Sequence, residues 1–267
     1  MQLGAAAATT LFDEVGPAGT VLYRLLFAAG LLVAVWRPRP LASGREALGI
    51  AVVFGVSLAA MNYCFYEALD RIPLGIAVTL EFVGPLAVAI AGSRRALDLL
   101  WVILAAAGIL LLAGPEGSSP DALGVAFALA AGGFWGAYIL LSARIGRAFR
   151  GGSGLAIAMV VAAAVMAVPG AAAGGGELLR PELAAVGLAV ALLSSALPYS
   201  LELEALRRIP TGTFGVMMSL EPAVAALVGL VALSQGLIAV EVLGIALVIA
   251  ASAGALREPG APSPTEA

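Results

Sequence analysis

Histidine and lysine are both absent from the 267 residues, so all 14 basic side chains are arginines. Without them the chain cannot form a His-x-x-x-His zinc site, a Ser-His relay, a lysine Schiff base or a phosphate-binding Gly-Lys-Ser/Thr loop. The single cysteine, Cys64, lies inside an apolar run. It excludes a disulfide within the chain and is expected to pack in the core. These absences argue against an enzyme, and the sequence predicts no catalytic residue, metal site or cofactor.

Charge is scarce as well, because charged residues make up 12% of the chain and hydrophobic residues 61%. A water-soluble core of this length could not use so much apolar material, so we expect an all-α, polytopic membrane protein. A spanning helix needs about 20 apolar residues. The sequence predicts nine full spans, at roughly 17–36, 47–66, 73–92, 97–114, 122–143, 154–173, 183–203, 211–233 and 239–256.

One stretch occurs twice at a constant offset of 137 residues. Residues 67–75 read Glu-Ala-Leu-Asp-Arg-Ile-Pro-Leu-Gly, and residues 204–212 read Glu-Ala-Leu-Arg-Arg-Ile-Pro-Thr-Gly. Pro85 and Pro222 also match at this spacing. So many identities at one offset indicate a duplication. We expect an N-terminal copy at 1–114, a C-terminal copy at 115–257, and a disordered cytoplasmic tail at 258–267.

The first helix is expected to be incomplete, because the apolar stretch before Asp13 is only about half as long as a span needs. The repeat partner of the span at 122–143, shifted back by 137 residues, would begin upstream of Met1. We therefore expect nine full spans plus a stub, in a ten-helix protein whose true start lies upstream. A signal peptide is the weaker interpretation, since no basic region precedes the run.

The loops alternate in charge. Arg71 and Arg180 lie on one side, and the other side holds eleven arginines: Arg37, Arg39, Arg45, Arg94, Arg95, Arg144, Arg147, Arg150, Arg207, Arg208 and Arg257. The positive-inside rule places the side with eleven, and both ends of the intact chain, in the cytoplasm. Five helices per copy is an odd number, so the two copies must be inverted. Such 5+5 inverted repeats are typical of alternating-access transporters, with a substrate site near the midplane.

Two acids lie near the middle of their spans, Glu81 in 73–92 and Glu221 in 211–233. A carboxylate at that depth is costly and is functional by default, although a neutral acid bonded between helices is the alternative. Pro85 and Pro222 each remove a helix hydrogen bond. The freed carbonyl could accept a bond from a ligand, or the kink could serve packing alone.

Other polar and aromatic residues are candidates for the same site. Arg24 lies about eight residues into its span and could bind a substrate carboxylate, pair with a glutamate, or extend to the membrane surface. Asn62 and Tyr66 share one helical face, as do Trp135 and Tyr138. Tyrosines near span ends can instead form an interfacial belt, and paired aromatics can serve lipid or packing contacts.

Taken together, these stretches resemble the EamA-type drug/metabolite transporters, and the likeness covers nearly the whole chain. The matching stretches are 55–58, 61–63, 65–66, 73–76, 80–82, 84–88, 135, 138–140, 197–202, 213–215 and 218–223. The resemblance implies proton-driven export of small amino acids of the threonine and homoserine kind across the bacterial inner membrane. It adds Tyr199 and Ser219 to the substrate-binding candidates Glu81, Glu221, Arg24, Asn62, Tyr66, Trp135 and Tyr138.

The predicted mechanism uses Glu81 and Glu221 for both substrate and proton. An ionised acid would attract the substrate ammonium, protonation from outside would favour release, and Arg24 would hold the carboxylate. The partners are then a small amino acid, protons and the lipid bilayer, with no nucleic acid, and homodimerisation is left open. Three alternatives stay open: a uniporter or an exporter of another small metabolite, efflux of hydrophobic cations, and a membrane scaffold without transport.

Overall fold

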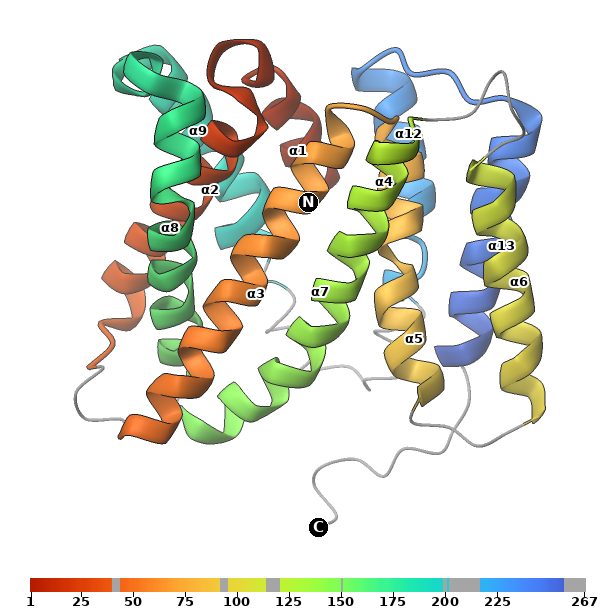
Figure 1. Ribbon diagram of the computed structural model, residues 1–267, viewed down its shortest axis with the longest axis horizontal. Helices are drawn as coiled ribbons and strands as arrows, with labels where there is room; N and C mark the ends of the chain where they lie inside the picture. The colour runs from red at the N-terminus through yellow and green to blue at the C-terminus, as the bar shows by residue number, and fades with distance from the viewer. Residues whose placement is uncertain are drawn as a thin grey trace.

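A computed structural model describes residues 1–39, 44–91, 96–113, 121–149, 151–198, 201 and 217–256. Within these ranges every regular element is a helix (Figure 1). Residues 114–120 at the junction of the two predicted copies, Tyr199 and the predicted tail lie outside the described residues. The elements are α1 (Gln2–Thr9), α2 (Phe12–Trp36), α3 (Arg45–Leu69), α4 (Leu74–Glu81), α5 (Val83–Ala91), α6 (Ala96–Ala113), α7 (Ala122–Ala148), α8 (Ser153–Gly174), the 3-10 helix η2 (Gly175–Leu179), α9 (Pro181–Ala191), the π-helix η3 (Leu192–Ala196), α12 (Glu221–Ala232) and α13 (Ala239–Leu256).

The described helices lie where the sequence places its apolar segments. Four are long and apolar enough to cross a membrane: α2, α3, α7, and α8 continued to Leu179. Five shorter apolar stretches fall on the other predicted spans: Leu74–Val88, Leu100–Leu112, Pro181–Ala196, Glu221–Ala232 and Ala239–Ala255. The eight residues of α1 lie in the predicted stub. The expectation of an all-helical, multi-pass protein is therefore confirmed.

Helix ends follow local residue chemistry. Within α2, Gly16 takes a left-handed φ of 68°, and the regular helix resumes at Pro17, where the predicted span begins. Proline is suited to a first turn because it has no N–H to leave unpaired. Pro181 starts α9 in the same way. At α7, a side-chain oxygen of Asp121 caps the helix by accepting a hydrogen bond from the Leu123 amide at 3.0 Å.

Helices far apart in sequence pack in antiparallel pairs, of which α2 with α8 is the most extensive (Figure 1). At one end of this pair, the ring of Trp36 lies against Gly152. At the other end, Arg180, just beyond α8 and η2, lies 3.3 Å from a carboxylate oxygen of Glu14. The two helices therefore run in opposite directions.

The pair of α3 and α7 also runs antiparallel. The hydroxyl of Ser57 donates to the Phe134 carbonyl at 3.2 Å. Further along, the rings of Tyr63 and Phe127 meet edge to face at 6.3 Å. Residue numbers therefore fall along α7 as they rise along α3, so the start of α7 lies beside the end of α3. This pair joins the N-terminal and C-terminal parts of the chain.

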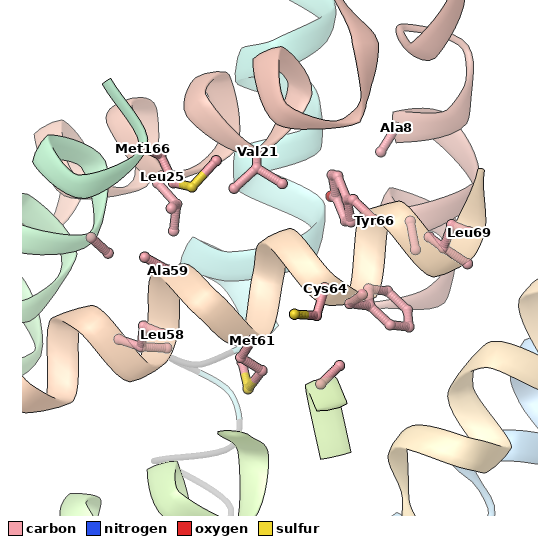
Figure 2. Packing of buried hydrophobic residues seen from close by; sticks show 14 of the residues in the cluster. Ala8, Val21, Leu25, Leu58, Ala59, Met61, Cys64, Tyr66, Leu69 and Met166 are labelled. Carbon is pink, nitrogen blue, oxygen red and sulfur yellow. The ribbon is translucent and has the colours of Figure 1, made fainter. Parts of the chain in front are cut away.

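The core lies where α1, α2, α3 and α8 meet. Figure 2 shows Tyr66 and Cys64 of α3 near Val21 of α2, with Ala8 of α1 and Met166 of α8 on either side. Cys64 is free and buried, as expected from its apolar surroundings in the sequence. On the outside, large apolar side chains are exposed, among them Leu110, Val168 and Val231. Exposed apolar side chains in such number suit a surface that faces lipid.

Candidate functional site

Arg24 is buried in the middle of α2, with a relative exposure of 6%. Its Nε donates to the Ser195 hydroxyl at 2.9 Å, and its Nη2 donates to the Ser194 carbonyl at 3.0 Å. Nη1 lies 3.4 Å from the Tyr66 hydroxyl, and the guanidinium carbon lies 5.5 Å from the centre of the Tyr66 ring. The side chain is thus bonded between α3 and η3 and does not extend toward the membrane surface. These contacts give a buried cation fixed acceptors and a fixed orientation.

The serines that hold Arg24 belong to η3, a π-helical turn within the predicted span at 183–203. Ser194 and Ser195 are both 1% exposed. Single π-turns inside helices are frequent at functional sites, because they change the direction of side chains and backbone carbonyls. These serines were not among the site residues predicted from the sequence. The only signal in the sequence was two adjacent hydroxyls in an apolar span, the first of them equivalent to Ser57 at the repeat offset.

Glu81 is the last residue of α4, directly before a break at Phe82, and it is 8% exposed. Pro85 has no N–H, so the Glu81 carbonyl lacks the donor that a regular helix would supply. The backbone of α7 comes very close here. A Cβ added to Gly132 would lie 2.6 Å from the Glu81 carbonyl oxygen. The helix break and this close packing together position the acid.

Glu221 begins α12, and Pro222 follows it in the first turn. Ser219, which is fully buried, lies in the break before this helix. α12 packs against α4, and the carboxyl group of Glu81 interacts electrostatically with that of Glu221 and with the guanidinium of Arg24. Glu81 therefore interacts with both of the other charges that the sequence marked inside the membrane.

The remaining candidates surround this group to different degrees. Asn62 is 2% exposed, and its amide nitrogen donates to the Leu58 carbonyl within α3 at 2.8 Å. Trp135 meets the ring of Phe82, the neighbour of Glu81, edge to face at 5.2 Å. Tyr138 stacks on Phe54 at 5.0 Å, in the interface between α3 and α7. Trp135 is thus close to the acid, whereas the Tyr138 ring packs between helices.

A set of polar contacts joins the two halves of the chain at one end of the bundle. Arg71 lies 3.8 Å from Asp121, at the start of α7. The Gln235 side-chain oxygen accepts a hydrogen bond from the Leu74 amide at 3.0 Å. Arg180, which also pairs with Glu14, donates to Glu177 at 2.9 Å. This hydrogen bond and the negative charge of Glu177 raise the pKa of Arg180.

Among the described residues, no group of three or more histidine, cysteine, aspartate or glutamate side chains is arranged to hold a metal ion. The buried acid Glu81 instead interacts with the Arg24 guanidinium and precedes Phe82, whose ring meets that of Trp135. This donor set suits an organic ligand that carries both charges.

Buried charges at the centre of an apolar helical bundle define a multi-pass membrane protein with a polar interior. The model of the EamA-like transporter family matches residues 122–257, and close relatives match the rest of the chain. The chain belongs to the EamA-like transporter family. This confirms the resemblance found in the sequence.

The similar curated proteins are exporters. The threonine/homoserine exporter RhtA of Salmonella typhimurium (strain SL1344) is 43% identical over 265 residues, which cover 97% of this chain and 90% of that protein. RhtA of Escherichia coli (strain K12) is 44% identical over 256 residues, which cover 95% and 86%. A solved crystal structure with 19% identity matches with a TM-score of 0.64 over 95% of this chain and 94% of that one. At that identity the match shows the fold alone.

Proposed function

We propose that this protein is a secondary active transporter that exports small amino acids of the threonine and homoserine type across the bacterial cytoplasmic membrane. The observation that carries the proposal is the burial of Arg24 and Glu81, which interact electrostatically, together with the interaction of Glu81 with the second acid, Glu221. An amino acid carries one ammonium and one carboxylate, and this site offers a partner of opposite sign to each. The names of the relatives support the same substrate class.

Alternating access is supported by the way repeat-equivalent helices pack. At the offset of 137 residues, α2 corresponds to α8 and α6 to α13. Each of these helices lies against its own counterpart. A pair related by a two-fold axis in the membrane plane must run antiparallel, so the direction of each pair bears on the proposal.

The contacts in these pairs are antiparallel. In the pair of α6 and α13, Gly108 lies against Gly244 and Trp101 lies against Gly254, so residue numbers fall along α13 as they rise along α6. Where Gly108 meets Gly244, the earlier Trp101 meets the later residue, as antiparallel helices require. We infer a 5+5 inverted-repeat architecture with copies at 1–114 and 115–257 that rock against each other.

Proton coupling is assigned to Glu81 and Glu221. An ionised acid attracts the substrate ammonium, and a proton taken from the outer side weakens that attraction and favours release. Like charges at two nearby carboxyls make it costly for both to be ionised without a cation, so substrate and proton compete for the pair. By the positive-inside rule, we place the arginine-rich loops and the C-terminus in the cytoplasm.

The test is transport by purified protein in proteoliposomes with an imposed pH gradient. Labelled threonine and homoserine should move, and dissipation of the gradient should stop their accumulation. A panel of other amino acids, uncharged metabolites and a cationic dye separates the alternatives. Movement of the dye or of an uncharged metabolite, with none of threonine, would overturn the proposed substrate class, and no flux of any compound would favour a scaffold.

A further inference from the structure

The π-helical turn η3 holds one edge of the Arg24 guanidinium through two consecutive residues. Nε donates to the Ser195 hydroxyl at 2.9 Å, and the adjacent Nη2 donates to the Ser194 carbonyl at 3.0 Å. These two nitrogens form one planar edge, so paired bonds to them fix the plane of the group as well as its position. The contacts join residues 171 and 170 positions apart in the sequence.

The π-turn explains how one short segment can present both the Ser195 hydroxyl and the Ser194 carbonyl to Arg24. The Leu197 amide bonds to the Leu192 carbonyl, five residues earlier, instead of the residue four earlier that an α-helix would use. One inserted residue rotates the following side chains by about 100° around the helix axis. Both serines are 1% exposed, so water does not compete for these bonds.

We propose that Ser195 is a positioning residue that orients Arg24 toward the carboxylate of the transported amino acid. This inference rests on the proposed function and deepens it, because it assigns recognition of the carboxylate to a turn of the C-terminal copy that acts through an arginine of the N-terminal copy. Loss of the Ser195 hydroxyl frees the guanidinium to turn. Binding of the carboxylate then weakens, while recognition of the ammonium is unaffected.

The experiment measures uptake of labelled threonine into inside-out proteoliposomes, with threoninol as a competitor that keeps the ammonium and lacks the carboxylate. Ser195→Ala should raise the KM for threonine about tenfold, as expected for loss of a hydrogen bond to a charged group, and should leave the inhibition constant of threoninol unchanged. Ser195→Thr retains a hydroxyl and should restore most of the affinity.

The matched control is Ser252→Ala. Ser252 is also 1% exposed, and its hydroxyl has no hydrogen-bond partner among the described residues of α13 and its neighbours. Removal of the Ser252 hydroxyl should leave the KM for threonine and the inhibition constant of threoninol unchanged. Melting in detergent confirms that each variant is folded, and Ser195→Cys replaces Ser195→Ala if the alanine variant cannot be reconstituted.

The outcomes separate the two proposals. A wild-type KM in Ser195→Ala, or an equal loss of affinity for threonine and threoninol, would overturn the positioning role while leaving the transport function intact. A wild-type protein that moves no threonine would overturn the proposed function and this inference with it.

Discussion

At the scale of single residues, the structure explains how an ionisable side chain can be kept inside an apolar bundle. An acid in the middle of a membrane costs at least about 2.5 kcal/mol, so it needs a partner or a function. Glu81 has Arg24 as a nearby opposite charge and Glu221 as a nearby like charge. Arg24 in turn is bonded to Ser195, Ser194 and Tyr66. The pairing of opposite charges lowers the cost of burial, and the like charge makes the site sensitive to protons.

Glu81→Gln tests whether the buried acid carries the proton. Glutamine keeps the shape of the side chain but can neither ionise nor carry a proton, so export driven by a pH gradient should be abolished while expression and melting temperature stay near those of the wild type. Flux of labelled threonine in proteoliposomes measures the effect. Glu46→Gln, at an exposed acid in the first turn of α3, is the control. Full gradient-driven export by Glu81→Gln would contradict the mechanism.

At the scale of secondary-structure elements, two helix breaks shape the site. α4 ends at Glu81 and α5 begins at Val83, while α12 begins at Glu221 after a break at 219–220. A proline follows each break and prevents a continuous helix. The α7 backbone packs directly against the first break through Gly132. Because only glycine permits this approach, the position of Glu81 depends on a residue in another helix.

The glycine gives a prediction with a neighbouring control. In Gly132→Ala, the new methyl group would lie 2.6 Å from the Glu81 carbonyl oxygen, so the two helices must separate. We expect a loss of about 1–3 kcal/mol of stability, together with reduced transport. Gly133→Ala, where a Cβ meets nothing within 4 Å, should be neutral or slightly stabilising. Thermal unfolding in detergent compares the two variants, and equal melting temperatures would show that the interface tolerates the methyl group.

At the scale of the whole molecule, several polar contacts between the two halves lie at one end of the bundle, in addition to those inside it. They include the approach of Arg71 to Asp121, the hydrogen bond from the Leu74 amide to Gln235, and the pair of Arg180 with Glu14. Five of the eleven loop arginines fall in described residues, at the ends of α2 and α7 and the start of α3, on the opposite side of the bundle (Figure 1). Under the proposed orientation, the end that carries these contacts between the halves lies outside.

This assignment predicts which cysteines a membrane-impermeant thiol reagent can reach. In a Cys64→Ala background, Arg180→Cys should be labelled in intact cells, whereas Arg147→Cys should be labelled only after the membrane is permeabilised. Both positions are exposed at helix ends, so access depends on the side of the membrane alone. Labelling of both positions in intact cells would refute the proposed orientation.

The amino-acid sequence by itself determined the helical, membrane-embedded character of this protein, its internal repeat, and the unusual status of Arg24, Glu81 and Glu221. These features depend on composition, spacing and the cost of charge in hydrocarbon, all of which act locally along the chain. Glu81 and Glu221 do not align at the repeat offset, so the sequence predicted a shared site for them without the register in which they meet.

Only the tertiary structure decided which side chains meet. The bond from Arg24 to Ser195 spans 171 residues, and it depends on how α2 and η3 are rotated and on the extra residue of a π-turn. The contact of Gly132 with Glu81 likewise depends on the crossing of two helices. Residue spacing indicates which face of a helix is apolar. The packing of all helices together selects the few polar groups that lie within hydrogen-bonding distance across them.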